Sequence, residues 1–234
     1  MNFGAHKNLA RAKYKEAQES DVTDDTLLTI FKNGAIDIAF HAKLFPTNKY
    51  FAAVADQKEY LISDVADDYL CMHESGLWFN YGTVASPDYD ELDVSTIESL
   101  DNERSDWRNE DSGAPEYYVV EQNNIIIHPT PEDALTDAFR LYYYRKPTEI
   151  SNDNSYIFEG STDIPHYKIF DEALFKYYRW QASSILQKSS QQIDAEEKAY
   201  KVELSEKMSL IRRRPDMSRK RRTRMRIGHI PRCY

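Results

Sequence analysis

The stretch between Trp107 and Pro147 constrains the fold most, because it holds three extended segments separated by turn residues. Residues 116–121 are aromatic and β-branched, residues 125–127 are three isoleucines, and residues 138–145 include three consecutive tyrosines. The Gln-Asn-Asn sequence at 122–124 suits a tight hairpin between the first two segments, because asparagine tolerates positive φ. We therefore predict a β-meander in this part of the chain.

Prolines mark the ends of the second and third of these segments. Pro129 and Pro131 follow the isoleucines, and Pro147 follows the tyrosines. Proline has no N–H to donate to a neighbouring strand, and it restricts the residue before it to extended geometry. We therefore expect the second and third strands to end just before these prolines.

Tyrosine is abundant in this chain, with 17 residues against only 7 glycines. Tyrosine offers a large contact area with a polar tip and is enriched at protein–protein interfaces, so this composition is typical of a protein that assembles. Side chains alternate between the two faces of a strand, so consecutive tyrosines point in opposite directions. We predict that Trp107 is a core residue and that one or two of three tyrosines lie at a subunit interface: Tyr142, Tyr143 and Tyr144.

Helical periodicity flanks the β-rich stretch on both sides. Apolar residues recur at helical spacing over residues 23–44, where Thr23 is a suitable N-cap and Pro46 marks the end. A proline suits the first turn of a second helix with a broad apolar face over residues 165–187. A third helix follows Ser189 and Ser190 and is ended by Pro215; its narrow apolar stripe reaches Ile211, and its other sides are charged. We predict that the last two form an αα-hairpin arm.

Shorter elements are predicted between these regions. Residues 7–15 suit a short amphipathic helix, and residues 58–62 and 70–81 suit strands. A Ser-x-x-Glu capping box at 95–98 opens a short helix that ends at Leu100.

Together these elements predict an α+β fold. We expect a helical core, made of an N-terminal helix and a C-terminal αα-hairpin, from residues 1–53 and 150–211. A β-rich insertion would occupy residues 54–149, and an extended basic C-terminal tail would occupy residues 212–234.

Charge is divided unevenly along the chain. Residues 212–234 hold ten basic residues and one acid, a local charge of +9, so the total of −9 leaves −18 for the rest. A basic tail on an acidic body is typical of a chain that uses the tail in an interaction. The candidate docking residues of the tail are Arg212, Arg213, Arg214, Arg219, Lys220, Arg221, Arg222, Arg224, Arg226, Ile227, Ile230, Arg232 and Tyr234.

Composition alone leaves three interpretations of the tail open. Its arginines could neutralise nucleic-acid phosphates with salt-dependent affinity, although the segment has little aromatic surface for stacking on bases. It could instead order in the groove of a protein partner, with Ile227, Ile230 and Tyr234 as apolar anchors. It could also be a flexible extension that aids solubility.

Signatures of catalysis are missing from the sequence. We find no phosphate loop, no Gly-x-Gly-x-x-Gly and no Gly-x-Ser-x-Gly, and the six histidines form no His-x-x-x-His pair. Cys71 and Cys233 are not at zinc-ligand spacing, and the acidic run 88–93 lacks the glycine and terminal glutamate of an EF-hand. We therefore predict no enzyme, metal or cofactor. A hydrolase with dispersed active-site residues remains an open alternative.

The compartment follows from similar features. The two distant cysteines do not form a disulfide framework, which favours synthesis in a reducing cytoplasm. No apolar run approaches the roughly 18 residues that span a bilayer. Residues 1–15 lack the apolar centre of a signal peptide. We expect a soluble, unexported protein without a membrane partner.

The order of these motifs resembles the head-to-tail connector, or adaptor, proteins of tailed bacteriophages, and the resemblance covers most of the chain. In that family a tryptophan precedes Gly-x-Pro-x-Tyr-Tyr. A short apolar strand ending in Pro-x-Pro follows, then a tyrosine-rich strand ending in Lys-Pro and an Ile-Pro-x-Tyr helix start. The matching residues here are Trp107, Gly113, Pro115, Tyr117, Tyr118, Pro129, Pro131, Tyr142, Tyr143, Tyr144, Lys146, Pro147, Ile164, Pro165 and Tyr167.

The resemblance implies a structural virion protein at the head-to-tail interface, made in the host bacterial cytoplasm and without catalytic residues. It implies a homo-oligomeric ring of about 12 subunits that docks on the portal protein, extends the DNA channel and carries tail or neck proteins. The basic tail would insert between portal subunits. Genomic DNA would pass an acidic lumen without sequence-specific binding. The alternative function is a nucleic-acid-binding protein that uses the Arg-rich tail.

Overall fold

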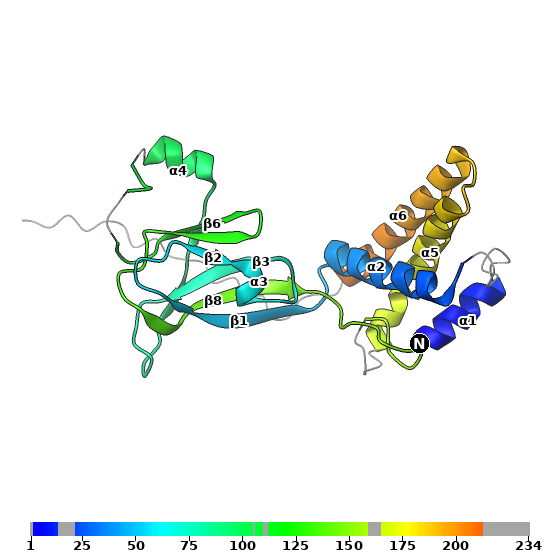
Figure 1. The fold of residues 1–234 in the computed structure, drawn as a ribbon, viewed down its shortest axis with the longest axis horizontal. Coiled ribbons are helices and arrows are strands. Elements are labelled where there is room, and N and C mark those ends of the chain that lie inside the picture. The colour runs from blue at the N-terminus through cyan, green and yellow to red at the C-terminus, as the bar shows by residue number, and fades with distance from the viewer. Residues whose placement is uncertain (1, 14–21, 105, 110–111, 159–164, 213–234) are drawn as a thin grey trace, which may run out of the picture.

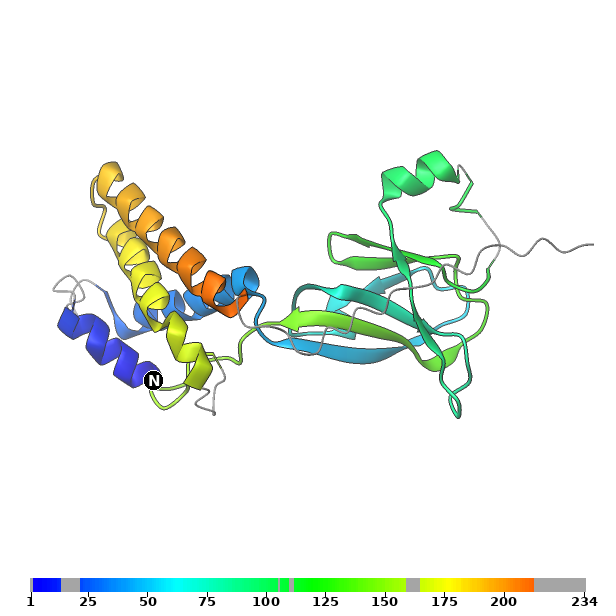
Figure 2. The same ribbon diagram turned by 180° about the vertical axis from the view of Figure 1, so that it is seen from behind.

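The protein has two lobes that lie end to end along its long axis, one built of helices and one of strands (Figures 1 and 2). The predicted α+β class is confirmed. The computed structural model describes residues 2–13, 22–104, 106–109, 112–158 and 165–212. The basic tail beyond residue 212 therefore lies outside the described residues.

The helical lobe is formed from both ends of the described chain. The elements of this lobe are α1 (Phe3–Lys13), α2 (Asp24–Ala42), the 3-10 helix η1 (Pro165–Phe170), α5 (Asp171–Ile185) and α6 (Ser190–Arg212). Within the described ranges, no helix is both long enough and apolar enough to cross a bilayer.

Helix α2 begins as predicted and ends differently. Thr23 has extended backbone geometry, and its Oγ1 accepts a hydrogen bond from the Thr26 N–H at 3.3 Å. At the other end Lys43 adopts a left-handed conformation with φ 50° and donates its N–H to the Ala39 carbonyl. Pro46 therefore does not end the helix as expected, because it is the first residue of a strand.

The contact between α2 and α5 forms the centre of the helical lobe. Phe31 stacks on Tyr178 with ring centroids 5.8 Å apart, and both side chains are fully buried. Gly34 allows the helices to approach closely, since an added Cβ would lie 2.8 Å from Tyr177 Cδ1 and 2.9 Å from Leu174 Cδ1. The identity of this one residue thus sets the spacing of the two helices.

Helices α5 and α6 form an αα-hairpin that leans over α2 (Figure 1). Tyr200 and Leu204 on α6 are buried, Met208 and Ile211 pack against the same core, and charged residues complete the contact. Glu203 is only 8% exposed and binds Lys176 at 2.5 Å and Lys207 at 2.8 Å. Hydrogen bonds from the two lysines lower the pKa of Glu203. The hairpin is therefore held by buried ion pairs as well as by apolar packing.

The β lobe is a sandwich of two four-stranded sheets. The first sheet has the strand order β1-β8-β3-β4 and the second has the order β2-β7-β6-β5. The strands are β1 (Pro46–Ala53), β2 (Glu59–Leu61), β3 (Tyr69–Asn80), β4 (Tyr89–Glu91), β5 (Asp93–Val94), β6 (Tyr117–Glu121), β7 (Asn124–His128) and β8 (Leu135–Arg145), with the short helices α3 (Ile62–Val65) and α4 (Ile97–Glu103).

Phe139 lies at the centre of the sandwich and is fully buried. Its ring contacts Phe51 at a centroid distance of 4.8 Å and Phe79 at 5.1 Å, both from the first sheet. Tyr60, from the second sheet, lies 5.6 Å from the same ring. The two sheets are therefore joined through one aromatic cluster.

The predicted β-meander is wrong in its third strand. β6 and β7 form the expected hairpin, in which Glu121 pairs with Asn124, although the positive φ of 52° falls on Gln122 and not on an asparagine. β8 does not pair with β7. It lies between β1 and β3 in the other sheet, because Phe139 and Leu141 fill the sandwich core from that side.

Two further boundaries differ from the sequence prediction. β1 pairs with β8 and belongs to the β lobe, whereas the predicted insertion begins only at residue 54. α4 is capped by Thr96, whose Oγ1 accepts a hydrogen bond from the Ser99 N–H at 3.1 Å, and not by Ser95. The Ser95 N–H donates to the Tyr118 carbonyl, so Ser95 continues the strand pairing and the helix begins one residue later than predicted.

Trp107 covers the second sheet from outside, together with α4. It is 4% exposed and packs with Leu100, Val119 and Ile126, so its prediction as a core residue is confirmed. Its Nε1–H donates to Asp101 Oδ1 at 2.7 Å. The Lys58 ammonium lies 4.0 Å from the ring centroid.

Replacement of Trp107 by alanine should therefore lower the free energy of unfolding by about 3 to 5 kcal/mol, because it removes a buried aromatic side chain and leaves a cavity. Urea unfolding of the variant and the parent measures this. Trp78→Ala is the matched control, since the Trp78 ring is partly exposed and should cost less. Equal stability of Trp107→Ala and the parent would contradict the core assignment.

Replacement of Glu203 by glutamine should destabilise the protein by about 1 to 3 kcal/mol at pH 7, because the charged hydrogen bonds to two lysines are lost. The folded-state pKa of Glu203 is lowered, so its contribution is complete above the unfolded value of about 4.3 and is lost as pH falls through the folded value. The difference between variant and parent should therefore close at acidic pH.

Urea unfolding curves at pH values from about 7 to about 3 measure this difference. Glu197→Gln is the control, because Glu197 pairs with Lys201 on the outer side of the same helix and should change stability by only about 0.3 to 0.5 kcal/mol. A Glu203 effect that is independent of pH would show that packing and not charge is responsible.

Candidate assembly surfaces

The predicted docking tail leaves the body at the end of α6. Arg212 is the last residue of this helix, which ends beside the C-terminal end of α2, on the side of the helical lobe nearest the β lobe (Figures 1 and 2). The other candidate residues lie outside the described residues: Arg213, Arg214, Arg219, Lys220, Arg221, Arg222, Arg224, Arg226, Ile227, Ile230, Arg232 and Tyr234.

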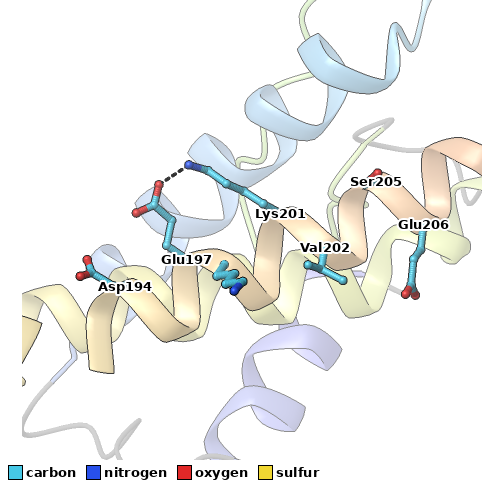
Figure 3. A pocket seen from close by; sticks show the side chains of 7 residues that line it. Asp194, Glu197, Lys201, Val202, Ser205 and Glu206 are labelled. Carbon is cyan, nitrogen blue, oxygen red and sulfur yellow. Dashed lines mark ion pairs between the residues drawn. The ribbon is translucent and has the colours of Figure 1, made fainter. Parts of the chain in front are cut away.

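The side of α6 that is turned away from α5 forms a shallow depression that is open to solvent. Glu197 and Lys201 point toward each other there and form an ion pair of 2.6 Å (Figure 3). Val202 is half exposed beside them. Acidic, basic and apolar side chains alternate on this surface, which favours contact with a protein over chemistry. The lining residues are Asp194, Glu197, Lys198, Lys201, Val202, Ser205 and Glu206.

A second depression lies between α2 and the segment 146–150, where the chain returns from the β lobe. Lys32 Nζ and Glu149 Oε1 form an ion pair of 2.8 Å across it, and the bond to Lys32 lowers the pKa of Glu149. Ile36 contributes apolar surface to this depression, and Phe40, one turn further along α2, is 47% exposed.

The three candidate interface tyrosines are placed differently. Tyr143 points into the sandwich, stacks on Tyr69 and donates its hydroxyl to Asp68 Oδ1 at 2.7 Å, and burial raises its pKa. Tyr144 points the other way but is only 5% exposed, beside His73. Tyr142 keeps part of its ring exposed. Of the three, Tyr142 alone is therefore accessible to a partner.

Tyr142 belongs to an aromatic outer face of the first sheet, which we call the outer face. Arg140 lies at its centre, with the guanidinium carbon 5.3 Å from the Tyr50 ring and 4.6 Å from the Tyr142 ring. The Arg140 Nε–H donates to Asn48 Oδ1 at 3.3 Å. The outer face comprises Asn48, Tyr50, Trp78, Tyr89, Glu91, Arg140 and Tyr142.

Strand register builds this face. Tyr50 pairs with Arg140 across β1 and β8, and Arg140 pairs with Trp78 across β8 and β3. Trp78 in turn pairs with Glu91 on β4, so these four residues form one row across the sheet. Side chains of paired residues point to the same side of a sheet.

Sequence reasoning missed Tyr50, Trp78 and Arg140 as candidate site residues. The local signal was present as period two, because Arg140 and Tyr142 are separated by one residue. What the sequence did not show was which strands would be neighbours. Tyr50 and Arg140 lie 90 positions apart and meet only through the β1–β8 pairing.

His6 has a structural position in the helical lobe. His6 Nε2 lies 3.1 Å from Asp171 Oδ1 and His6 Nδ1 lies 3.0 Å from the Asn2 carbonyl, so this buried ring joins α1 to α5. Across the part of the chain that the structure describes, no group of three His, Cys, Asp or Glu side chains is placed to hold a metal ion.

Comparison with known proteins identifies the family of the chain. No curated protein matches the chain. The sequence model of the SU10 adaptor protein family matches residues 1–227, which include both lobes and most of the basic tail. The chain therefore belongs to the SU10 adaptor protein family, a family of phage head-to-tail adaptors.

Proposed function

We propose that the protein is one subunit of a ring that docks on the portal of a tailed phage and extends its DNA channel. Membership of the adaptor family makes the chain a structural phage protein, and such an adaptor is a component of the virion. The observation that carries the finer proposal is the division of charge between a tail of +9 and a body of −18.

The tail acts as the portal anchor. It follows α6 in the sequence, and the last buried side chain described in that helix is Leu204, eight residues before Arg212. Its arginines can form bidentate bonds to carboxylates in a portal cleft. Ile227, Ile230 and Tyr234 can then fill apolar pockets of the same cleft. A tail of this composition gains order from the partner that it binds.

The body forms the channel and the platform for the tail of the phage. A charge of −18 per subunit, repeated around a ring of about 12 copies, repels DNA phosphates, so the genome slides without sequence-specific binding. The elongated subunit, with lobes at opposite ends, suits contacts with different partners above and below (Figure 1). Tail or neck proteins bind the end opposite the portal.

Truncation after Arg213 should leave the fold intact and abolish attachment to the portal. Every buried side chain of α6 lies before this point, Leu204 being the last, so the melting temperature should stay within about 2 °C of the parent. Co-sedimentation with purified portal rings measures attachment. If the truncated protein unfolds or still binds the portal, the tail is not the anchor.

A mobility-shift assay with the full-length protein separates this function from nucleic-acid binding. A regulator that uses the Arg-rich tail on DNA would retain a complex at moderate salt without the portal, whereas an anchor tail should lose DNA as salt rises.

The isolated subunit should be a monomer, or only weakly associated, at physiological salt. Bodies that each carry −18 repel one another, and the tail lacks its groove until the portal is present. Sedimentation velocity should therefore give the mass of one chain, 27.4 kDa. A stable ring of the isolated protein would contradict the expected order, in which the portal comes first.

A further inference from the structure

Arg140 on the outer face is held in place before any partner binds. Its guanidinium contacts the rings of Tyr50 and Tyr142, and Asn48 accepts a hydrogen bond from its Nε–H. A planar guanidinium that is already stacked loses little conformational freedom when it forms a bidentate pair.

The nearest carboxylate in the same row of the sheet is that of Glu91, two strands away from Arg140. Among the residues that the structure describes, Arg140 forms no ion pair, although the body carries −18 and many other cations are paired with carboxylates. An arginine fixed by aromatic rings and left without a carboxylate suits an anionic group from another molecule.

The rest of the outer face favours a protein partner. Tyrosine, tryptophan and arginine are the residues that dominate binding energy at protein interfaces. Tyr50 is 42% exposed, and the rings of Trp78 and Tyr142 are partly exposed beside Arg140. Nucleic acid is disfavoured, because a body of −18 repels phosphates and bases inside a duplex are not available for stacking.

A complementary surface lies on the opposite side of the same lobe. Helix α4 and residues 106–109, which we together call the α4 segment, cover the second sheet. Helix α4 and β1 lie on opposite sides of the sandwich (Figure 1). The exposed carboxylates of the α4 segment include Glu98, Glu103 and Asp106. The nearby cations Arg104 and Arg108 are already paired, with Glu116 and Asp101 respectively.

From these observations we infer that the outer face binds the α4 segment of the next copy of this chain, with Arg140 paired to a carboxylate of that segment. The two surfaces differ and lie on opposite sides of the lobe, so the contact is heterologous. A heterologous contact repeated by a fixed rotation gives a ring when that rotation closes, as it does in the proposed ring. The inference rests on the proposed ring and names the contact that joins its β lobes.

Charge reversal at Arg140 tests the contact. Adaptor is titrated onto purified portal rings, and the bound copies are counted by sedimentation. Arg140→Glu should raise the concentration for half-saturation at least about tenfold and remove its cooperativity, since lateral contacts fail while the tail still binds. Lys49→Glu is the matched control, because it makes the same charge change on β1 and disturbs only a loose pair with Asp67 at 3.9 Å.

A compensating variant identifies the partner surface. Arg140→Glu combined with Glu98→Lys and Glu103→Lys should restore cooperative binding, because the charges on both sides are then exchanged. If Arg140→Glu assembles like the parent, or if the combined variant stays defective, the inference is wrong. Thermal melting of each variant shows that the fold is kept.

A second readout keeps the contact separate from portal docking. The same proteins are sedimented alone at high concentration, where the parent should show weak self-association that Arg140→Glu removes and the combined variant restores. A parent that fails to bind the portal overturns the proposed function. Self-association that is equal in the parent and in Arg140→Glu overturns this inference.

Discussion

The antiparallel pairing of β1 with β8 is the constraint on which the rest of the structure depends. β1 follows α2, and β8 leads back toward η1, so this pair carries both chain crossings between the lobes. Its register sends Phe51 and Phe139 into the sandwich core and Tyr50 and Arg140 to the outer face. A slip of one residue would exchange the two faces and expose the core.

The helical lobe and the β lobe use charged side chains in different ways. Glu203 lies in a largely buried contact, where lysines from α5 and α6 satisfy it. Breaking a buried pair of this kind costs more than removing an exposed one, such as the pair of Lys32 and Glu149. On the outer face of the β lobe the opposite holds, because Arg140 is rigid but has no carboxylate partner among the described residues. The first arrangement stabilises the subunit, and the second suits assembly.

Local signals predicted the elements better than their arrangement. The Thr23 cap, the hairpin at Gln122 and the core position of Trp107 could be predicted, because caps, turns and large apolar residues act over a few positions. The placement of β8 beside β1 could not, since strand order depends on which faces fill a common core. β1 itself was missed because only Ala53 is buried along it. The burial of Tyr144 likewise depends on His73, 71 positions earlier.

The central claim is that this adaptor joins its neighbours through the outer face. An electron cryomicroscopy structure of the adaptor bound to its portal tests it most directly. We predict that Arg140 lies within about 4 Å of a carboxylate on the α4 segment of the adjacent copy, with Tyr50 and Tyr142 buried by the contact. A ring in which the outer face is turned to solvent, or in which Arg140 contacts only its own chain, would contradict the account.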